Sequence, residues 1–211
     1  MALETPARPI LLHRFALSGH CHRVELLLNL LQLPHVCIDV NLAAQEQKTP
    51  RFLALNPFGQ VPVIEDGSLV LGDSNAILGY LAARYGDGDW TPASPALAAE
   101  QQRWFSVAAG PLAFGPAAAR ANRLFGSPHP LEAARARAHA LFALMDAHLE
   151  RRAFLLGERL SLADLANYAY TAHAPEGGVS LGDYPHLRAW LARIENVPRF
   201  VAMPRSTSAS A

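Results

Sequence analysis

Residues 56–74 read NPFGQVPVIEDGSLVLGDS, and this segment indicates the fold more clearly than any other part of the chain. Residues 61–65 and 69–71 are two short runs that favour β-strands. Asp66 and Gly67 stand between them, and this dipeptide is typical of a tight turn. The segment therefore predicts a β-hairpin.

Pro62 lies inside the first of these runs. A central strand does not accept it there, because proline has no N–H to donate to a neighbouring strand. The conflict suggests a rigid cis bond between Val61 and Pro62, which would leave the main-chain N–H and C=O of Val61 facing outward. An exposed main-chain pair of this kind binds an extended peptide as one more strand.

Asp73 and Ser74 follow the hairpin and open a helical pattern over residues 75–85. Their side chains and main-chain amides crowd the start of that helix, where the helix dipole is positive. The sequence therefore predicts a carboxylate-binding site at the start of this helix.

The whole segment resembles the glutathione-binding half of the cytosolic glutathione transferases, whose thioredoxin-like domain carries the same valine–cis-proline and acidic residue–serine pairs. The resemblance continues along nearly the whole chain. It implies that the main chain of Val61, turned outward by Pro62, pairs with the cysteinyl part of glutathione. It also implies that Asp73 and Ser74 hold the γ-glutamyl end, and that glutathione is a co-substrate.

Two glutamines match positions that hold the glycyl carboxylate in similar enzymes. They are Gln60, directly before Val61, and Gln47, farther upstream. Each alone would be an ordinary surface glutamine, and only the register with Val61 singles them out. Glu100 and Gln101 match positions from which the family sometimes reaches the γ-glutamyl amine of the neighbouring subunit.

The composition limits the classes of function. The 211 residues carry 18 basic and 18 acidic side chains, so neither nucleic acid nor an anionic membrane is an expected partner. No apolar run approaches the roughly 20 residues that span a bilayer, and the N-terminus lacks the apolar centre of a signal peptide. Cys21 and Cys37 are too few for a disulfide scaffold, so we expect a cytoplasmic protein.

Strand and helix patterns alternate in the first part of the chain. Strands are expected at residues 10–15, 35–40, 61–65 and 69–71, and helices at residues 24–33, 49–55 and 75–85. Only helical stretches follow, at residues 96–109, 111–124, 131–151, 161–173 and 184–195. We expect a glutathione-binding domain over residues 1–86, a linker over 87–95, a helical domain over 96–205 and a flexible tail over 206–211.

The resemblance sharpens this fold class. It implies an α/β thioredoxin-like N-terminal domain with a mixed four-stranded sheet and an all-α C-terminal domain, the glutathione transferase fold. Ser161 and Asp164 have the spacing of a capping box ahead of an apolar helix. The family has this box as a folding element, and we expect no catalytic role for it.

Ser18 follows the first expected strand, at the position where the family places a Tyr, Ser or Cys against the sulfur of glutathione. The chain thus resembles the serine-type bacterial and theta-like members. A free thiol has a pKa of about 8.5, and a donated hydroxyl together with amides at the helix start favours the reactive thiolate. Alternatively, Ser18 only caps the helix.

Two neighbours of Ser18 leave alternatives open. His20 either donates a hydrogen bond to the sulfur, with an imidazole pKa of about 6.5, or is an exposed loop histidine. Cys21, between His20 and His22, could have a lowered pKa and form mixed disulfides with glutathione. A metal site is not expected, because adjacent helical residues diverge. Cys37 is expected in the core.

In the family the helical domain supplies the pocket for the electrophile. The candidate walls are Trp104, Phe105, Ala108, Phe114, Tyr168 and Ala172. An aromatic stripe at helical spacing also fits plain core. Residues 174–179 are expected to form a loop at the edge of the pocket. Few polar groups point to one substrate, so the site is expected to be apolar and permissive.

The sequence thus favours a homodimeric glutathione transferase acting on small hydrophobic electrophiles. The first alternative is a glutathione-dependent disulfide reductase or peroxidase that uses the same site, with Cys21. The second is a non-catalytic binding protein of the same fold, which the set of expected glutathione contacts disfavours.

Overall fold

A computed structural model describes residues 4–206, and contacts divide the chain into two compact units. Unit 1 comprises Met1–Thr91 with Pro198–Met203, and unit 2 comprises Pro92–Val197 with Pro204–Ala211. The division after Thr91 falls inside the segment 87–95 that the sequence marks as a linker. No pattern in the sequence indicates that Pro198–Met203 returns to unit 1.

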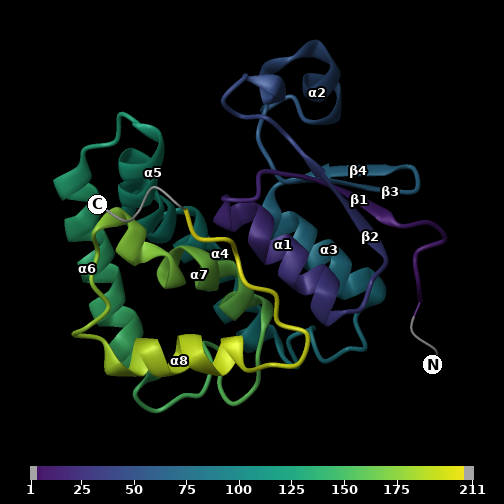
Figure 1. The fold of residues 1–211 in the computed structure, drawn as a ribbon. Coiled ribbons are helices and arrows are strands. Elements are labelled where there is room, and N and C mark those ends of the chain that lie inside the picture. Colours follow the sequence, from purple (N-terminus) through teal and green to yellow (C-terminus); the bar gives the residue numbers. More distant parts are fainter. Residues whose placement is uncertain (1–3, 207–211) are drawn as a thin grey trace. The chain divides into compact units, whose positions relative to one another are not determined.

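Unit 1 is built on a mixed four-stranded sheet in the order β2-β1-β3-β4 (Figure 1). The strands are β1 (Ile10–Arg14), β2 (His35–Asp39), β3 (Val63–Asp66) and β4 (Leu69–Gly72). β1 runs parallel to β2 and antiparallel to β3, and β3 runs antiparallel to β4. The sheet is the one that the resemblance implies, and the fold class is confirmed.

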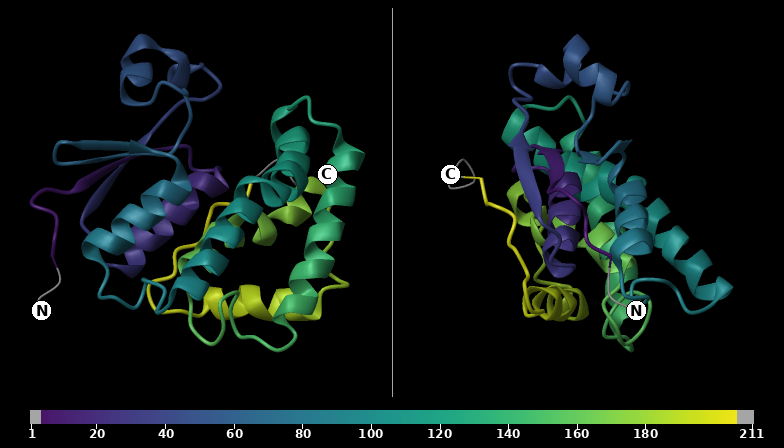
Figure 2. Two further views of the ribbon diagram at one scale, coloured as in Figure 1. Left: turned by 180° about the vertical axis from the view of Figure 1, so that it is seen from behind. Right: turned by 90° about the vertical axis from the view of Figure 1, so that its right-hand side faces the viewer.

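Helices α1 (Gly19–Leu30) and α3 (Ser74–Tyr85) lie side by side against one face of this sheet (Figures 1 and 2). Leu12 and Ile64 are register partners on that face, and both are fully buried. His13 points to the opposite face, because successive strand residues alternate. There its ring meets the edge of Phe52 in α2 (Pro50–Leu55), which follows the short helix η1 (Glu46–Lys48).

The hairpin forms as expected, with Asp66 paired to Leu69 and Gly67 in the left-handed region at φ 60°. Its first strand begins only after Pro62, because that residue cannot donate to the ladder. Helix α1 begins five residues earlier than its apolar pattern indicates, because Ser18 caps it. It ends at Leu30, ahead of Gln32 with φ 56°.

Unit 2 contains no strand among its described residues, as expected. Its helices are α4 (Pro95–Ala109), η2 (Ala113–Ala117), α5 (Ala118–Phe125), α6 (Leu131–Leu149), α7 (Leu162–Ala172), η3 (Ala174–Gly177) and α8 (Pro185–Glu195). The stretch predicted as one helix over residues 111–124 contains a π turn, η2, where Pro116 lacks the N–H of a regular helix. At Gly115 a Cβ would lie 3.0 Å from the main-chain nitrogen of Ala138, so a larger residue would require the main chain of α6 to shift.

Helix α7 is buried along nearly its whole length, and the predicted capping box holds its start. Asp164 accepts hydrogen bonds from the amide and the hydroxyl of Ser161 at 2.9 and 2.6 Å. Its other oxygen accepts from the amide of Leu155 and the indole N–H of Trp190, both at 2.8 Å. One fully buried carboxylate thus joins three segments of unit 2.

The end of the chain contributes to both units. In unit 1 the imidazole Nε2 of His22 donates to the carbonyl of Val201 at 2.8 Å, and Met203 is buried. In unit 2 the amide of Ser206 donates to Glu176 at 2.7 Å. Residues 207–211 of the expected tail lie outside the described part of the chain. None of the helices over residues 4–206 is long and apolar enough to cross a bilayer.

Replacing Asp164 with alanine leaves the buried amide of Leu155, the part-buried amide of Ser161 and the buried Trp190 indole without their acceptor. Each unsatisfied buried donor costs about 1–3 kcal/mol. We therefore expect Asp164→Ala to lower the free energy of unfolding by about 3 kcal/mol or more, measured by urea denaturation. Glu132→Ala, at a side chain that is 82% exposed, should change it by less than about 0.5 kcal/mol. Equal effects of the two substitutions would contradict this role.

Candidate active site

Three chain segments meet at one end of the sheet in unit 1. β1 and β4 run in the same direction and β3 runs against them. The ends that follow β1 and β4 therefore lie at the same edge as the start of β3. Ser18 follows β1, Val61 and Pro62 precede β3, and Asp73 follows β4. Strand direction alone thus gathers residues that lie up to 55 positions apart in the sequence.

The bond between Val61 and Pro62 is cis, as predicted. The ladder of β3 begins at Val63, which is opposite both His13 and Gly72. Among residues 4–206 no hydrogen bond uses the main-chain N–H or C=O of Val61. The N–H and C=O of Val61 can therefore hydrogen-bond to an extended peptide that is not part of this chain.

A buried asparagine that the sequence analysis did not identify holds the loop before this bond. Asn56 is 6% exposed, and its amide donates to the carbonyl of Gln60 at 2.8 Å. Its carbonyl oxygen accepts from the amide of Phe58 at 3.1 Å. Lys48 adds a hydrogen bond to the carbonyl of Gly59 at 3.0 Å. The Asn-Pro dipeptide, a frequent start of a turn, was the signal for this arrangement.

Asp73, the cap of α3, and Ser74, its first residue, differ in exposure. Asp73 has φ 70°, unusual for a residue with a side chain, and its Oδ1 accepts from the amides of Asn75 and Ala76 at 2.9 Å each. It is exposed, whereas Ser74 is 5% exposed and turned inward. Strained backbone of this kind is concentrated at ligand-binding positions.

Arg23 lies beneath Ser74, and the sequence analysis did not single it out. It is 1% exposed, and its Nη1 donates to Ser74 Oγ at 3.2 Å and to Asn75 Oδ1 at 2.9 Å. A lone arginine followed by an apolar run was the available signal. The run predicted a buried helix face but not that the arginine would lie inside it.

Ser18 caps α1, as the structural alternative expects. Its Oγ accepts from the amide of Cys21 at 3.4 Å. A hydroxyl has one proton and two lone pairs, so accepting one hydrogen bond leaves the O–H able to donate. Capping and donation to a sulfur are therefore compatible.

His20 lies in the first turn of α1, so it is not an exposed loop histidine. Its Nδ1 is 3.5 Å from Ser74 Oγ. Burial, together with the nearby charge of Arg23, lowers the pKa of His20 to about 3. The predicted titration near pH 6.5 is therefore wrong, and the imidazole is neutral at physiological pH.

The model of the glutathione S-transferase N-terminal domain matches residues 17–84, and that of the C-terminal domain matches residues 117–198. The chain belongs to the glutathione S-transferase family. Glutathione S-transferase 3 of Zea mays is 34% identical, over 96% of this chain and 99% of the relative. Glutathione S-transferase GstB of Escherichia coli is 30% identical, over 86% and 90%.

Solved structures of this family share the fold. The crystal structure of a glutathione S-transferase from Pseudomonas fluorescens has a TM-score of 0.86 and 34% sequence identity. The match covers 92% of this chain and 98% of that one. Membership of the family and the fold class that the resemblance implies are thereby confirmed.

The two cysteines lie in different environments. Cys21 is 1% exposed, and its sulfur accepts from the amide of Phe15 at 3.4 Å. Burial raises the pKa of its thiol to about 11, which contradicts the alternative of a lowered pKa. Cys37 was expected in the core but is only half-buried, and its thiol faces Glu25 at 3.8 Å.

The two glutamines lie in different environments. Gln60 is exposed, whereas Gln47 in η1 is 9% exposed. The Oε1 of Gln47 has no hydrogen-bond partner among residues 4–206. No hydrogen bond within that part of the chain joins the two side chains, and their role toward a carboxylate stays a prediction.

In unit 2 the expected pocket walls are divided between the surface, where Phe114 is 53% exposed, and the interior. Trp104, Phe105 and Tyr168 are 5%, 8% and 3% exposed. The indole of Trp104 meets the ring of His148 at 5.1 Å, and the hydroxyl of Tyr168 donates to Glu195 at 2.9 Å. Residues 174–177, expected as a loop, form the short helix η3. An electrophile site at these side chains remains a prediction.

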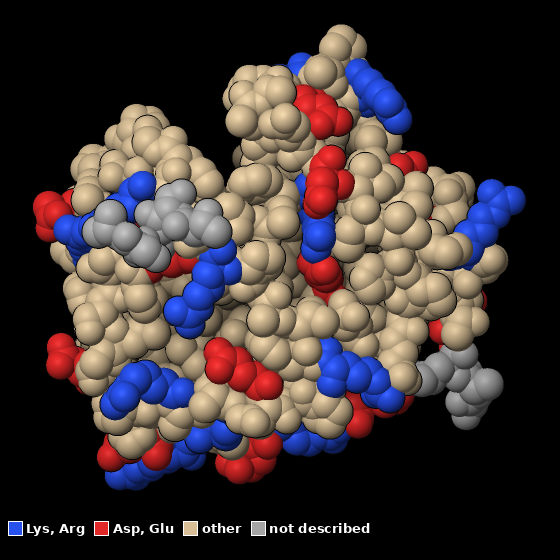
Figure 3. All heavy atoms as spheres, in the orientation of Figure 1, with Lys and Arg blue, Asp and Glu red and all other residues tan. Residues whose placement is uncertain are grey.

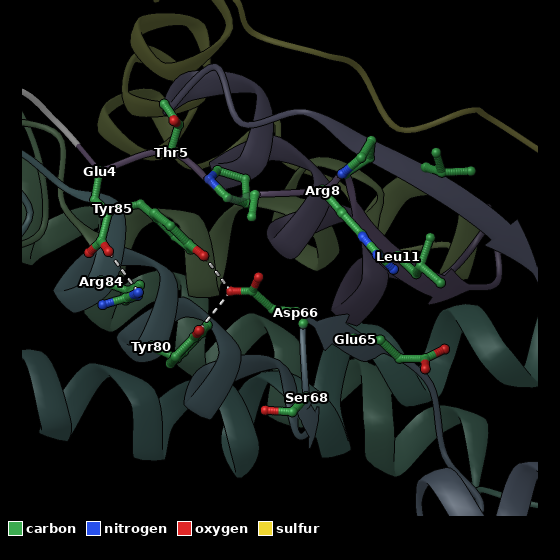
Figure 4. Close-up of a pocket in the computed structure, with 15 residues that line it drawn as sticks. Glu4, Thr5, Arg8, Leu11, Glu65, Asp66, Ser68, Tyr80, Arg84 and Tyr85 are labelled. Carbon is green, nitrogen blue, oxygen red and sulfur yellow. Dashed lines mark hydrogen bonds and ion pairs between the residues drawn. The ribbon is translucent and has the colours of Figure 1, made fainter.

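A further cavity in unit 1, of about 760 Å³, lies at the opposite end of the sheet (Figure 4). Asp66 accepts hydrogen bonds from the hydroxyls of Tyr80 and Tyr85 there, both at 2.6 Å, and Arg84 pairs with Glu4. None of the residues discussed for glutathione lines it. On the face drawn in Figure 3, acidic and basic side chains are interspersed, and neither forms a broad patch.

The low pKa of His20 has a measurable consequence. The unfolded chain takes up a proton on this histidine below pH of about 6.5, whereas the folded chain does so only near 3. Stability should therefore fall as pH falls through this window, by up to about 1.4 kcal/mol per pH unit from this group. We expect His20→Gln to reduce the slope in acid denaturation. An NMR titration of the His20 ring with a midpoint near pH 6.5 would contradict the burial argument.

Proposed function

We propose that this chain is a serine-type glutathione transferase that activates the glutathione thiol for attack on small apolar electrophiles. The observation that carries the proposal is the main chain of Val61 at the cis bond, which makes no hydrogen bond within residues 4–206 and lies at the same sheet end as Ser18 and the start of α3. A tripeptide with a central thiol and carboxylates at both ends matches these groups.

In this proposal the cysteinyl residue of glutathione pairs with Val61 as an added strand. Its γ-glutamyl carboxylate lies at the start of α3, and the exposed Asp73 faces the ammonium group. Gln60 and Gln47 serve the glycyl carboxylate. Each contact uses a group with donors or acceptors suited to it.

Ser18 then donates its hydroxyl proton as a hydrogen bond to the glutathione sulfur. The thiol proton leaves to solvent, and the thiolate attacks the electrophile, forming a carbon–sulfur bond as the leaving group departs with its electron pair. Lowering a thiol pKa by about two units requires about 2.7 kcal/mol, within the range of one or two charge-assisted hydrogen bonds. His20 is neutral, so it can add a hydrogen bond but not a charge.

The alternative of disulfide exchange through Cys21 is weaker on this geometry. A buried thiol with a raised pKa is rarely present as thiolate and cannot attack a mixed disulfide readily. Cys21 instead supports the loop of Ser18 through its contact with Phe15. Free cysteines also suit a reducing compartment, so we place the enzyme in the cytoplasm.

Ser18→Ala tests the central role. We expect kcat/KM for conjugation of an aromatic halide to fall about 100-fold, because about 2.7 kcal/mol of thiolate stabilisation is lost. The Kd for glutathione, measured by isothermal titration, should change less than about threefold, because the main-chain and carboxylate contacts remain.

Two controls accompany this substitution. Ser106→Ala, at an exposed serine on α4, and Cys21→Ser should both retain conjugation. Loss of turnover in Cys21→Ser together with an active Ser18→Ala would instead support the disulfide alternative. A wild-type protein that binds glutathione but conjugates none of a broad panel of electrophiles would overturn the transferase.

We also propose a homodimer, supported by apolar surface in both units. Phe58, in the loop that leads to the cis bond, is 78% exposed. In unit 2 an apolar groove of about 680 Å³ runs between α4 and α6, and Phe114 and Leu144 in it are 53% and 72% exposed. Exposed apolar patches of this kind mark interaction surfaces, and a second copy of the chain can cover both.

Sedimentation should give twice the 22.8 kDa of one chain for the wild type. Phe58→Asp and Leu144→Asp should each shift the population to monomers, because a buried unpaired carboxylate opposes association. Phe125→Asp, at an aromatic residue that is 51% exposed elsewhere in unit 2, is the control. A monomeric wild type, or dimers in both variants, would exclude this interface.

A further inference from the structure

Arg23 places a charged group inside unit 1. The residue is 1% exposed and lies in the buried part of α1, next to fully buried Val24. Moving a guanidinium out of water is costly, so a buried arginine must be compensated by well-placed acceptors or by a role for its charge. Packing alone therefore does not explain why an arginine is buried at this position.

Two of its contacts lead to the start of α3. Nη1 donates to Ser74 Oγ at 3.2 Å and to Asn75 Oδ1 at 2.9 Å. These are the first two residues of α3, which begins directly after the cap Asp73. Ser74 is itself 5% exposed, so the guanidinium contacts the helix start from the interior of unit 1.

The chemistry of the pair determines the direction of the serine hydroxyl. An arginine side chain has only donors, so Ser74 Oγ must be the acceptor in their hydrogen bond. The serine proton is then left to donate to another group. His20 Nδ1, at 3.5 Å, and an incoming carboxylate are the acceptors at this place. Arg23 thus occupies one lone pair of Ser74, leaves its O–H to donate to such a group, and adds positive charge behind the helix N-terminus.

We propose that Arg23 is a positioning residue for the γ-glutamyl carboxylate of glutathione, acting through Ser74 and through its buried charge. This inference rests on the proposed function, because it assumes that glutathione is the ligand. It predicts that Arg23 contributes to affinity only when the ligand carries that carboxylate. The charge of Arg23 also helps to keep His20 neutral, so the positive charge next to Ser74 is that of the guanidinium.

The test compares two ligands by isothermal titration: glutathione and γ-aminobutyryl-cysteinylglycine, which lacks only the α-carboxylate of the γ-glutamyl residue. Arg23→Gln should weaken glutathione binding about tenfold to hundredfold, the range of a charge-assisted hydrogen bond. Binding of the analogue should change less than about threefold. Arg14→Gln is the matched control, because it removes another arginine of unit 1, one that pairs with Glu25 and Asp39. It should leave the ratio of the two affinities unchanged.

A double-mutant cycle separates a positioning role from a structural one. If Arg23 acts through Ser74, then Ser74→Ala should weaken glutathione binding in the wild type and much less in Arg23→Gln. Arg23→Lys keeps the charge but has a single amine in place of the fork, so it should restore part of the glutathione preference. That variant also decides the question if Arg23→Gln does not fold.

Equal losses for both ligands in the Arg23 variants, or an unchanged affinity ratio, would overturn the proposal and leave a purely structural arginine. Failure of the wild-type protein to bind glutathione would instead overturn the proposed function. The two failures are therefore distinguishable in the same set of titrations.

Discussion

The candidate site depends on the directions of three neighbouring strands. β1 and β4 end where β3 begins, so whatever follows the first two and precedes the third must gather at one edge of the sheet. Ser18, Val61 and Asp73 occupy those three positions. Each is also held by local chemistry: a helix cap at Ser18, the buried amide of Asn56 beneath the loop of Val61, and the cap of α3 at Asp73. The edge would exist without these supports, but the groups on it would not be fixed.

The parts of this arrangement that follow from neighbouring residues could be predicted from the sequence. A proline among β-formers indicated the cis bond, Asp66 and Gly67 indicated the hairpin, and the spacing of Ser161 and Asp164 indicated the capping box. In each case the residues that determine the structure are within a few positions of one another. The family resemblance then supplied the mixed sheet, whose pairing joins strands that are far apart.

The predictions that failed concern groups whose environment is set by distant segments. For His20 an exposed loop position was one open alternative, and for Cys21 a lowered pKa was another, yet α1 begins at Gly19 and contains both in its first turn. Their pKa values move in the directions that burial requires, down for the imidazole and up for the thiol. Arg23 was overlooked for the same reason, since only the packing of α1 against α3 shows that Ser74 and Asn75 lie above it. Periodicity indicates a buried face but not which polar group on it finds a partner.

The return of residues 198–203 to unit 1 has a consequence for how the protein is made. The first 91 residues contain the whole sheet, but His22 and the buried Met203 show that part of this unit comes from the last tenth of the chain. A nascent chain of which only the sheet and its helices have left the ribosome therefore still lacks part of that unit. The N-terminal unit is completed after the helical unit has emerged, rather than before it.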